Sequence, residues 1–255
     1  MAPMLGALLM SFFPLQILFL FDVITASIGI SILLFFVKIP NLETQKETKG
    51  INYFNDIKEG IIYIKSNGFI LRLLIFSALF LVFATPAMLL TPLQVVRNFG
   101  DDVWRLSAIE IAFSLGMIIG GLVIAAWGGF KNRIFTMTFG LIFFGLTVVG
   151  LGLASNFWIY IGIFVITGIV MPFFNTPSMV ILQTKVEQEY MGRILSVFTM
   201  VSTSIMPLAM LVFGPVVDIV NINIVLIITG VILMFLSLFL VLNRTLRNAG
   251  ILEEK

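Results

Sequence analysis

The sequence contains no cysteine and no histidine. Without cysteine, the chain cannot form disulfides, thiolate metal ligands or iron–sulfur sites. Without histidine, it lacks the commonest general base and the commonest metal ligand, so any proton transfer must use aspartate or glutamate. It also shows no glycine-rich phosphate loop and no pair of acids at a membrane face. We therefore expect no metal site, no cofactor and no enzyme activity.

Charged residues are scarce as well, at 11% of the 255 residues, whereas a soluble domain carries about 25%. Hydrophobic residues make up 60% of the chain, and the mean hydropathy is +1.13. A water-soluble core cannot bury so much apolar sequence, but a lipid bilayer can accommodate it. The composition therefore predicts a polytopic membrane protein of the all-α class.

A helix needs about 20 consecutive apolar residues to cross the hydrocarbon core of a bilayer. The chain has several apolar stretches of that order, separated by short polar segments: 17–37, 69–91, 106–127, 134–154, 157–182, 194–217 and 222–242. Residues 1–13 are also apolar but are too few to cross, so they are predicted to form a half-span.

The spans and the polar segments define a domain organisation. We predict a half-span and one span in 1–37, a connector in 38–67, a C-terminal six-span bundle in 68–243 and a polar tail in 244–255. Within the connector, apolar residues recur at helical spacing opposite charged residues, which predicts an amphipathic helix on the membrane surface. These apolar residues are Phe54, Ile57, Ile61 and Ile64.

Lysine and arginine are distributed asymmetrically across the alternating spans. If 38–67 lies in the cytoplasm, all of the 15 basic residues except Arg97 and Arg105 lie on the cytoplasmic side. The positive-inside rule describes this asymmetry. We therefore predict a protein of the plasma (inner) membrane whose connector and C-terminus are cytoplasmic. Because the basic residues occur at span ends, they do not indicate nucleic-acid binding.

Glycine, proline and basic residues mark short segments between or within the spans. Residues 121–133 contain Gly121 and, seven residues later, Gly128, followed by the basic residues Lys131 and Arg133. These residues predict that span 106–127 ends in a turn that carries basic side chains.

Two further segments are distinctive. The sequence Gln-Thr-Lys-Val-Glu-Gln-Glu-Tyr-Met-Gly-Arg ends in Gly192 and Arg193. Here Gly192 is expected to let the chain turn, and Arg193 to anchor at the level of the lipid phosphates. Near the N-terminus, Ala-Pro-Met-Leu-Gly-Ala contains Pro3 and Gly6.

These segments and their order resemble the middle and C-terminal half of a transporter of the major facilitator superfamily. The segment with Gly121 and Gly128 is similar to the loop motif of that family, although Ala125 and Ala126 replace its acidic and internal basic residues. The segment ending in Gly-Arg resembles the macrolide-efflux branch. The N-terminal segment with Pro3 is similar to the end of the motif of drug–proton antiporters.

The resemblance implies a fold of two six-span halves joined by a long connector. This chain would run from the end of the fifth span to the twelfth. Residues 1–37 would then be the remnant of an N-terminal bundle, and the chain would be truncated at its N-terminus. It also implies efflux of drugs such as macrolides in exchange for protons, by alternating access.

Two acids lie within predicted spans, where an ionisable group is costly and is therefore a candidate for function. They are Asp22 in 17–37 and Glu110 in 106–127. Both are candidates for proton coupling. The alternative is that each lies at the wet outer end of its span, capping it or paired with Arg97 or Arg105.

Weakly polar residues within the spans are candidates for the wall of a substrate cavity. Ser114 and Met117 share the helical face of Glu110. The remaining candidates are Asn175, Thr199 and Thr203. The alternative is structural, because hydroxyl groups in membrane helices often bond to their own backbone.

Transport is therefore the predicted function, with the lipid bilayer, protons and a small amphipathic substrate as partners. The alternative is a truncated half that is inactive alone or requires a partner chain. That partner would be the missing N-terminal bundle or a second copy of this chain.

Overall fold

The computed structural model describes residues 15–36 and 53–251. The described residues are almost entirely helical, and the pairing of Asn132 with Ile251 is an isolated β-bridge. The helices are α2 (Leu15–Phe36), α3 (Tyr53–Ser66), α4 (Gly68–Leu89), α5 (Thr91–Phe99), α6 (Val103–Trp127), α7 (Arg133–Leu153), α8 (Phe157–Lys185), α9 (Gln188–Ile219), α10 (Ile222–Leu242) and α11 (Arg244–Ala249). The predicted all-α class is confirmed.

The chain divides into two compact units, Met1–Tyr53 and Phe54–Lys255. Helix α2 belongs to the first unit and corresponds to the predicted span 17–37. The predicted half-span 1–13, with Pro3 and Gly6, lies outside the described residues.

The second unit contains six helical segments that are long and apolar enough to cross a membrane, among the described residues. They agree with the predicted bundle of six spans. Two of them extend well beyond their predicted bounds: the first runs from Gly68 to Phe99 through α5, and the fifth begins at Gln188. The division of the chain into bundle remnant, connector and tail stays a prediction.

Asparagine side chains cap half of the described helices at their N-termini. Asn67, Asn132, Asn156, Asn221 and Asn243 precede α4, α7, α8, α10 and α11, and each side-chain oxygen accepts a hydrogen bond from a backbone N–H in the first turn. Such caps satisfy donors that have no partner within the helix. The short polar segments between the spans thus also fix where each helix starts.

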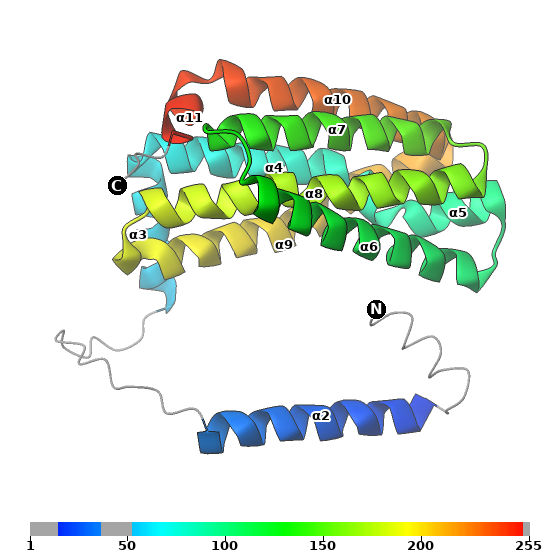
Figure 1. The fold of residues 1–255 in the computed structure, drawn as a ribbon, viewed down its shortest axis with the longest axis horizontal. Coiled ribbons are helices and arrows are strands. Elements are labelled where there is room, and N and C mark those ends of the chain that lie inside the picture. The colour runs from blue at the N-terminus through cyan, green and yellow to red at the C-terminus, as the bar shows by residue number, and fades with distance from the viewer. Residues whose placement is uncertain (1–14, 37–52, 252–255) are drawn as a thin grey trace. The chain divides into compact units, whose positions relative to one another are not determined.

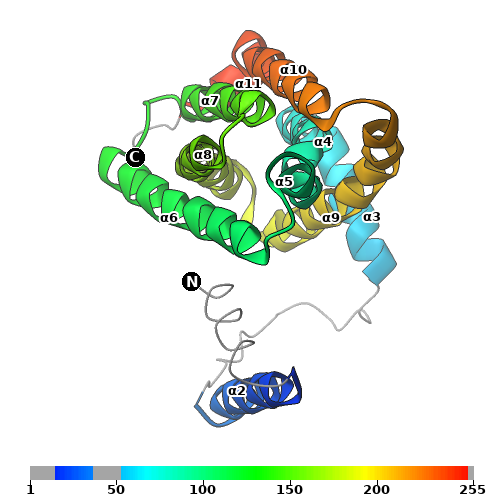
Figure 2. The same ribbon diagram turned by 90° about the vertical axis from the view of Figure 1, so that its right-hand side faces the viewer.

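The spans of the second unit run antiparallel to their neighbours in sequence. Helix α6 packs on α8, α7 packs on α8 and α10, and α4 packs on α9 and α10 (Figures 1 and 2). The bundle therefore has two ends. We call them the α5 end, where α4 meets α5, and the α11 end, where α10 meets α11.

Glycine allows the closest of these helix contacts. A Cβ atom on Gly116 of α6 would clash with the backbone of α8 at Val165, and a Cβ on Gly168 of α8 would clash with the backbone of α6 at Phe113. Small residues permit this approach of two backbones, which is typical of membrane helices. The α6–α8 contact is therefore set by residues that have no side chain.

The outer surface of the bundle is apolar. Large hydrophobic side chains are exposed along α6, α8, α9 and α10, among them Leu122, Ile159, Leu211 and Phe235. Inside, Phe80 packs between the rings of Phe144 and Phe174. Apolar residues therefore lie on both the inside and the outside, as expected of a bundle that is immersed in lipid.

Candidate functional site

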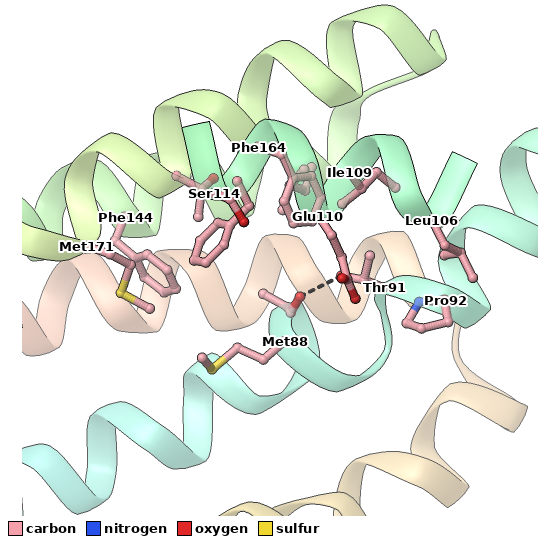
Figure 3. A pocket seen from close by; sticks show the side chains of 14 residues that line it. Met88, Thr91, Pro92, Leu106, Ile109, Glu110, Ser114, Phe144, Phe164 and Met171 are labelled. Atoms are coloured by element: carbon pink, nitrogen blue, oxygen red, sulfur yellow. Dashed lines mark hydrogen bonds between the residues drawn. The ribbon is translucent and has the colours of Figure 1, made fainter. Parts of the chain in front are cut away.

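A cavity of about 370 Å³ lies toward the α5 end of the bundle, between α4, α5, α6, α7 and α8 (Figure 3). We call it the α5 pocket. Most of its wall is apolar and flexible, with Met88, Leu106, Phe144, Phe164 and Met171 among the side chains that line it. The volume is in the range of small-molecule sites, roughly 300–1,000 Å³. Methionine adapts to ligands of different shapes.

Few polar groups enter the α5 pocket. They are Thr91, Glu110, Ser114 and Thr167. Two of these hydroxyls already have backbone partners, because Thr91 of α5 donates to the carbonyl of Ala87 in the last turn of α4 at 2.6 Å, and Thr167 donates to a carbonyl of its own helix at 2.8 Å. The carboxylate of Glu110 is therefore the charged group that a ligand in this pocket would meet.

Glu110 lies two turns into α6, and its side chain extends toward Thr91 and Pro92 (Figure 3). The arginines considered as its partners are engaged elsewhere. Arg105 lies 2.8 Å from Asp102, and Arg97 donates to the carbonyl of Val217 at 2.7 Å and lies 3.5 Å from Asp218. Within the described part of the chain, Glu110 forms no ion pair. The structure therefore gives no support to the alternative that these arginines neutralise Glu110.

The residues predicted for proton coupling and for the cavity wall divide into those that line the α5 pocket and those that do not. Glu110 and Ser114 line the α5 pocket together, as their spacing on one helical face predicted. Met117 continues along α6 but is 41% exposed and lies outside the pocket lining. Asn175 on α8 and Thr199 and Thr203 on α9 are also exposed and do not line it. Asp22 belongs to α2, in the other unit.

The loop motif at 121–133 forms the junction between α6 and α7. Gly128 ends α6 with a φ of 76°, in the left-handed region, and Arg133 donates from Nη1 to the carbonyl of Gly128. Lys131 is exposed. Gly121 lies within α6, and a Cβ there would meet open space. Gly128 and Arg133 thus have a local structural role.

The second motif differs from its prediction. Gly192 and Arg193 lie in the first turns of α9 and not in a turn between helices. Arg193 lies 2.9 Å from Glu59 of α3, and the stacked rings of Tyr63 and Tyr190 are 4.4 Å apart. The motif therefore holds the connector helix α3 against α9. The sequence alone did not predict the ion pair between Arg193 and Glu59, because an arginine near a lipid interface is expected there whether or not it has an acidic partner.

A buried polar cluster beside the α5 pocket was not predicted. Gln94 is 1% exposed, and its amide contacts three other helices. It accepts a hydrogen bond from the Tyr160 hydroxyl at 2.7 Å, and it donates to the carbonyl of Leu151 at 2.8 Å and to Asn223 Oδ1 at 3.1 Å. We call this set the Gln94 cluster. In the sequence Gln94 follows Pro92 in a polar segment, which indicates a solvated loop.

At the α11 end, the short helix α11 is tied to two other helices. The Asn132 side chain donates to the carbonyl of Arg247 at 2.8 Å, and Arg133 N donates to the carbonyl of Gly250 at 2.9 Å. Arg72 of α4 donates to Asn243 Oδ1 at 3.1 Å. The start of the predicted tail 244–255 is therefore part of the folded bundle.

Comparisons with known proteins agree with this architecture. The family model described as Major Facilitator Superfamily matches residues 1–210. Macrolide efflux protein A of Streptococcus pyogenes is 29% identical over 224 residues, which cover 87% of this chain and 55% of that protein. Macrolide efflux protein A of Enterococcus faecalis is 32% identical over 211 residues, which cover 82% of this chain and 64% of that protein. The chain thus spans less than two thirds of the length of these relatives, and no solved structure matches it.

Proposed function

Because the chain belongs to the Major Facilitator Superfamily, whose members are membrane transporters and not enzymes, we propose that it serves proton-coupled efflux of amphipathic small molecules. Macrolides are the first substrate class to test, because the two relatives described above are macrolide efflux proteins. The mechanism would be alternating access, in which helix bundles move around a site near the middle of the membrane.

The observation that carries this proposal is the α5 pocket with Glu110 on its wall. An amphipathic substrate needs an apolar, adaptable surface and few polar contacts, and the pocket offers phenylalanine, methionine and threonine side chains. Glu110 is exposed on the bundle but lies within a segment that is apolar enough to span a membrane, where an ionisable group is costly and is therefore a candidate for a functional group. Glu110 would bind a proton when the pocket faces one aqueous phase and release it when the pocket faces the other.

The distribution of charge supports the proposed orientation. Among the described residues, the α11 end carries the cluster of lysines and arginines listed here: Lys58, Lys65, Arg72, Lys131, Arg133, Lys185, Arg193, Arg244 and Arg247. The α5 end carries Arg97 and Arg105, each beside an aspartate. By the positive-inside rule, the α11 end and the connector would lie in the cytoplasm and the α5 pocket nearer the outer surface.

One feature favours the second candidate function, a half that works only with another bundle. Along α9 a strip of small polar side chains is exposed: Ser196, Thr199, Thr203 and Ser204. Membrane helices use such residues at contacts with other helices. A second six-span bundle on this strip would bring Thr199 and Thr203 into a shared cavity, and it could come from a longer protein or from a second copy.

Transport of radiolabelled erythromycin into everted membrane vesicles tests the proposal. With the interior acidified, vesicles that contain the protein should accumulate the drug, and Glu110→Gln should abolish the dependence on the pH gradient at unchanged protein yield. Asp101→Asn is the control, because Asp101 is an exposed acid at the same end outside the pocket. Unchanged pH-dependent uptake by Glu110→Gln would contradict the role of Glu110.

The same assay separates the two candidate functions. Uptake by the chain alone supports the first candidate function, efflux by this chain without a partner. If uptake requires co-expression of an N-terminal six-span bundle from a relative, the second candidate function is supported, a half that works only with another bundle. If neither preparation transports the drug, macrolide efflux is wrong for this chain.

A further inference from the structure

Helix α5 forms one wall of the α5 pocket through Thr91 and Pro92. It is separated from α4 by a bend at Leu90. Proline has no backbone N–H, so Pro92 cannot donate to the carbonyl of Met88, and the helical ladder is interrupted where α4 becomes α5. Two bonds cross the bend, from the Thr91 hydroxyl to the carbonyl of Ala87 and from Gln94 N to the carbonyl of Leu90. Contacts with the other spans must supply the rest of what orients α5.

Arg97 and Asn98 supply the more exposed polar contacts, with the carbonyl of Val217 at 2.7 Å and with Asn223 Oδ1 at 2.9 Å. The Gln94 cluster supplies the buried ones. Each polar atom of the Gln94 amide has a partner: the oxygen accepts from Tyr160 of α8, and the nitrogen donates to Leu151 in the last turn of α7 and to Asn223 in the first turn of α10. Leu151 is placed where helix carbonyls lack an intrahelical partner. A single side chain thus connects α5 to the ends of three spans.

Tyr160 links the same cluster to the pocket. It is fully buried, and its ring lies between Phe99 of α5 and Phe164 of α8, with centroid distances of 5.2 Å and 5.1 Å. Its hydroxyl donates to Gln94, and the side chain of Thr91 is a further polar neighbour. Since Phe164 and Thr91 both line the pocket, a shift of Tyr160 would move two sides of the wall.

We propose that Gln94 and Tyr160 are positioning residues that hold α5 as a wall of the α5 pocket, and so determine the access and size of the site for an apolar ligand. Neither residue lines the pocket, so their effect is transmitted through Thr91 and Phe164. The proposal rests on the proposed function only in taking this pocket as the substrate site.

Gln94 and Tyr160 can hold α5 in place because the Gln94 amide is buried. When one partner of a buried hydrogen bond is removed, the other keeps an unsatisfied polar atom, whose cost is larger than the net gain from the bond. Conformations in which α5 moves away and water reaches Gln94 then become relatively more favourable. Tyr160→Phe and Gln94→Leu each remove one partner at nearly unchanged volume. A shift of about tenfold in the population of the open wall is expected from such a loss.

Thiol labelling measures this opening, because the chain has no native cysteine. Thr167→Cys places a reporter on α8 inside the pocket, at a residue that is 5% exposed, and Ser237→Cys places one at a fully buried residue of α10 outside it. The purified protein in lipid vesicles is treated with a charged maleimide. We expect Tyr160→Phe and Gln94→Leu to raise the labelling rate at position 167 about tenfold and to leave position 237 unchanged.

Thr229→Val is the matched control variant. Thr229 is also buried, but its hydroxyl donates to carbonyls of its own helix, so its removal should not raise labelling at position 167. If Tyr160→Phe leaves the rate at position 167 unchanged, the proposal is wrong. It is equally wrong if labelling rises by the same factor at position 237, since that would report general loosening.

The experiment remains decisive if one variant fails to fold. Tyr160→Phe keeps the aromatic ring and its packing, so the proposal stands or falls on this variant even where Gln94→Leu yields no monodisperse protein. Labelling requires no substrate and no proton gradient. A failure of macrolide efflux therefore leaves this result unaffected, and a failure here leaves the role of Glu110 untouched.

Discussion

The Arg193 guanidinium lies 2.9 Å from the carboxylate of Glu59, and Gly60, the next residue, lies directly against the backbone of Arg193. The connector helix α3 is thereby fixed to the first turns of α9. Arg193 was expected to anchor at the level of the lipid phosphates, but in the structure it joins α9 to α3. An exposed ion pair contributes little by itself, about 0–1 kcal/mol, so the aromatic contact beside it must carry part of the attachment.

We predict that Tyr63→Ala releases α3 from α9. The stacked rings of Tyr63 and Tyr190 contribute roughly 0.5–1.5 kcal/mol beyond the area that they bury, so their loss should raise the fraction of detached α3 by about two- to tenfold. The rate of tryptic cleavage at Lys58 and Lys65 measures this fraction. Ile62→Ala is the control on the same helix, because Ile62 is exposed. Equal cleavage rates in the two variants would contradict the prediction.

We predict that Gly168→Val destabilises the bundle at the contact between α6 and α8. The new side chain has no room against the backbone at Phe113, and overpacking of this kind costs about 1–3 kcal/mol. The temperature of thermal unfolding in detergent should fall accordingly. Gly162→Val, in the same helix, should leave it nearly unchanged because a Cβ at Gly162 meets open space. A similar fall for both variants would show that helix propensity, and not the close contact, decides the outcome.

We predict that Gly128→Ala lowers stability by about 1–2 kcal/mol, because Gly128 has a φ of 76° and a left-handed conformation costs that much for a residue with a Cβ. Gly121→Ala should be neutral or slightly stabilising, since Gly121 lies within a helix and a Cβ there meets no atom. Chemical denaturation of the two variants gives the comparison. The reverse order of stabilities would show that Gly128 has another conformation.

We predict that Asn132→Ala destabilises the protein more than Asn221→Ala. Both side chains cap a helix, and the loss of a cap costs about 1 kcal/mol. Only Asn132 also donates to α11, through the carbonyl of Arg247 at 2.8 Å. Its loss should therefore also increase cleavage by trypsin after Arg244 and Arg247. If the two variants unfold at the same temperature and are cleaved at the same rate, α11 is not held by Asn132.

The spans could be predicted from the sequence because their main determinant is local. Apolar runs of sufficient length define α6, α7, α8 and α10 to within a few residues, and the spacing of Glu110 and Ser114 on one helix places both in the same pocket. The rest of the pocket could not be predicted. Thr167 and Met171 come from another span, and their position depends on how α6 and α8 cross.

Helix α5 shows why tertiary structure was needed. Its segment contains Pro92, Gln94, Arg97 and Asn98, which are residues typical of a solvated loop. The helix forms because Gln94 and Arg97 find partners on α7, α8, α9 and α10, which lie far away in the sequence. The residues around Gln94 and Arg97 in the sequence do not indicate these distant hydrogen-bond partners. For the same reason, Gly192 and Arg193 resembled a loop although they lie within α9.

The attachment of α11 also has a practical consequence for measurements of motion. Ile251 pairs with Asn132 through the isolated bridge and is 55% exposed, so a fluorophore coupled to a cysteine at this position would follow the start of α7 and not swing freely. Its distance from a second dye on α9 would therefore report the separation between the start of α7 and α9. Such a pair could record, by energy transfer in single molecules, whether α7 and α9 keep a fixed distance when a ligand is added.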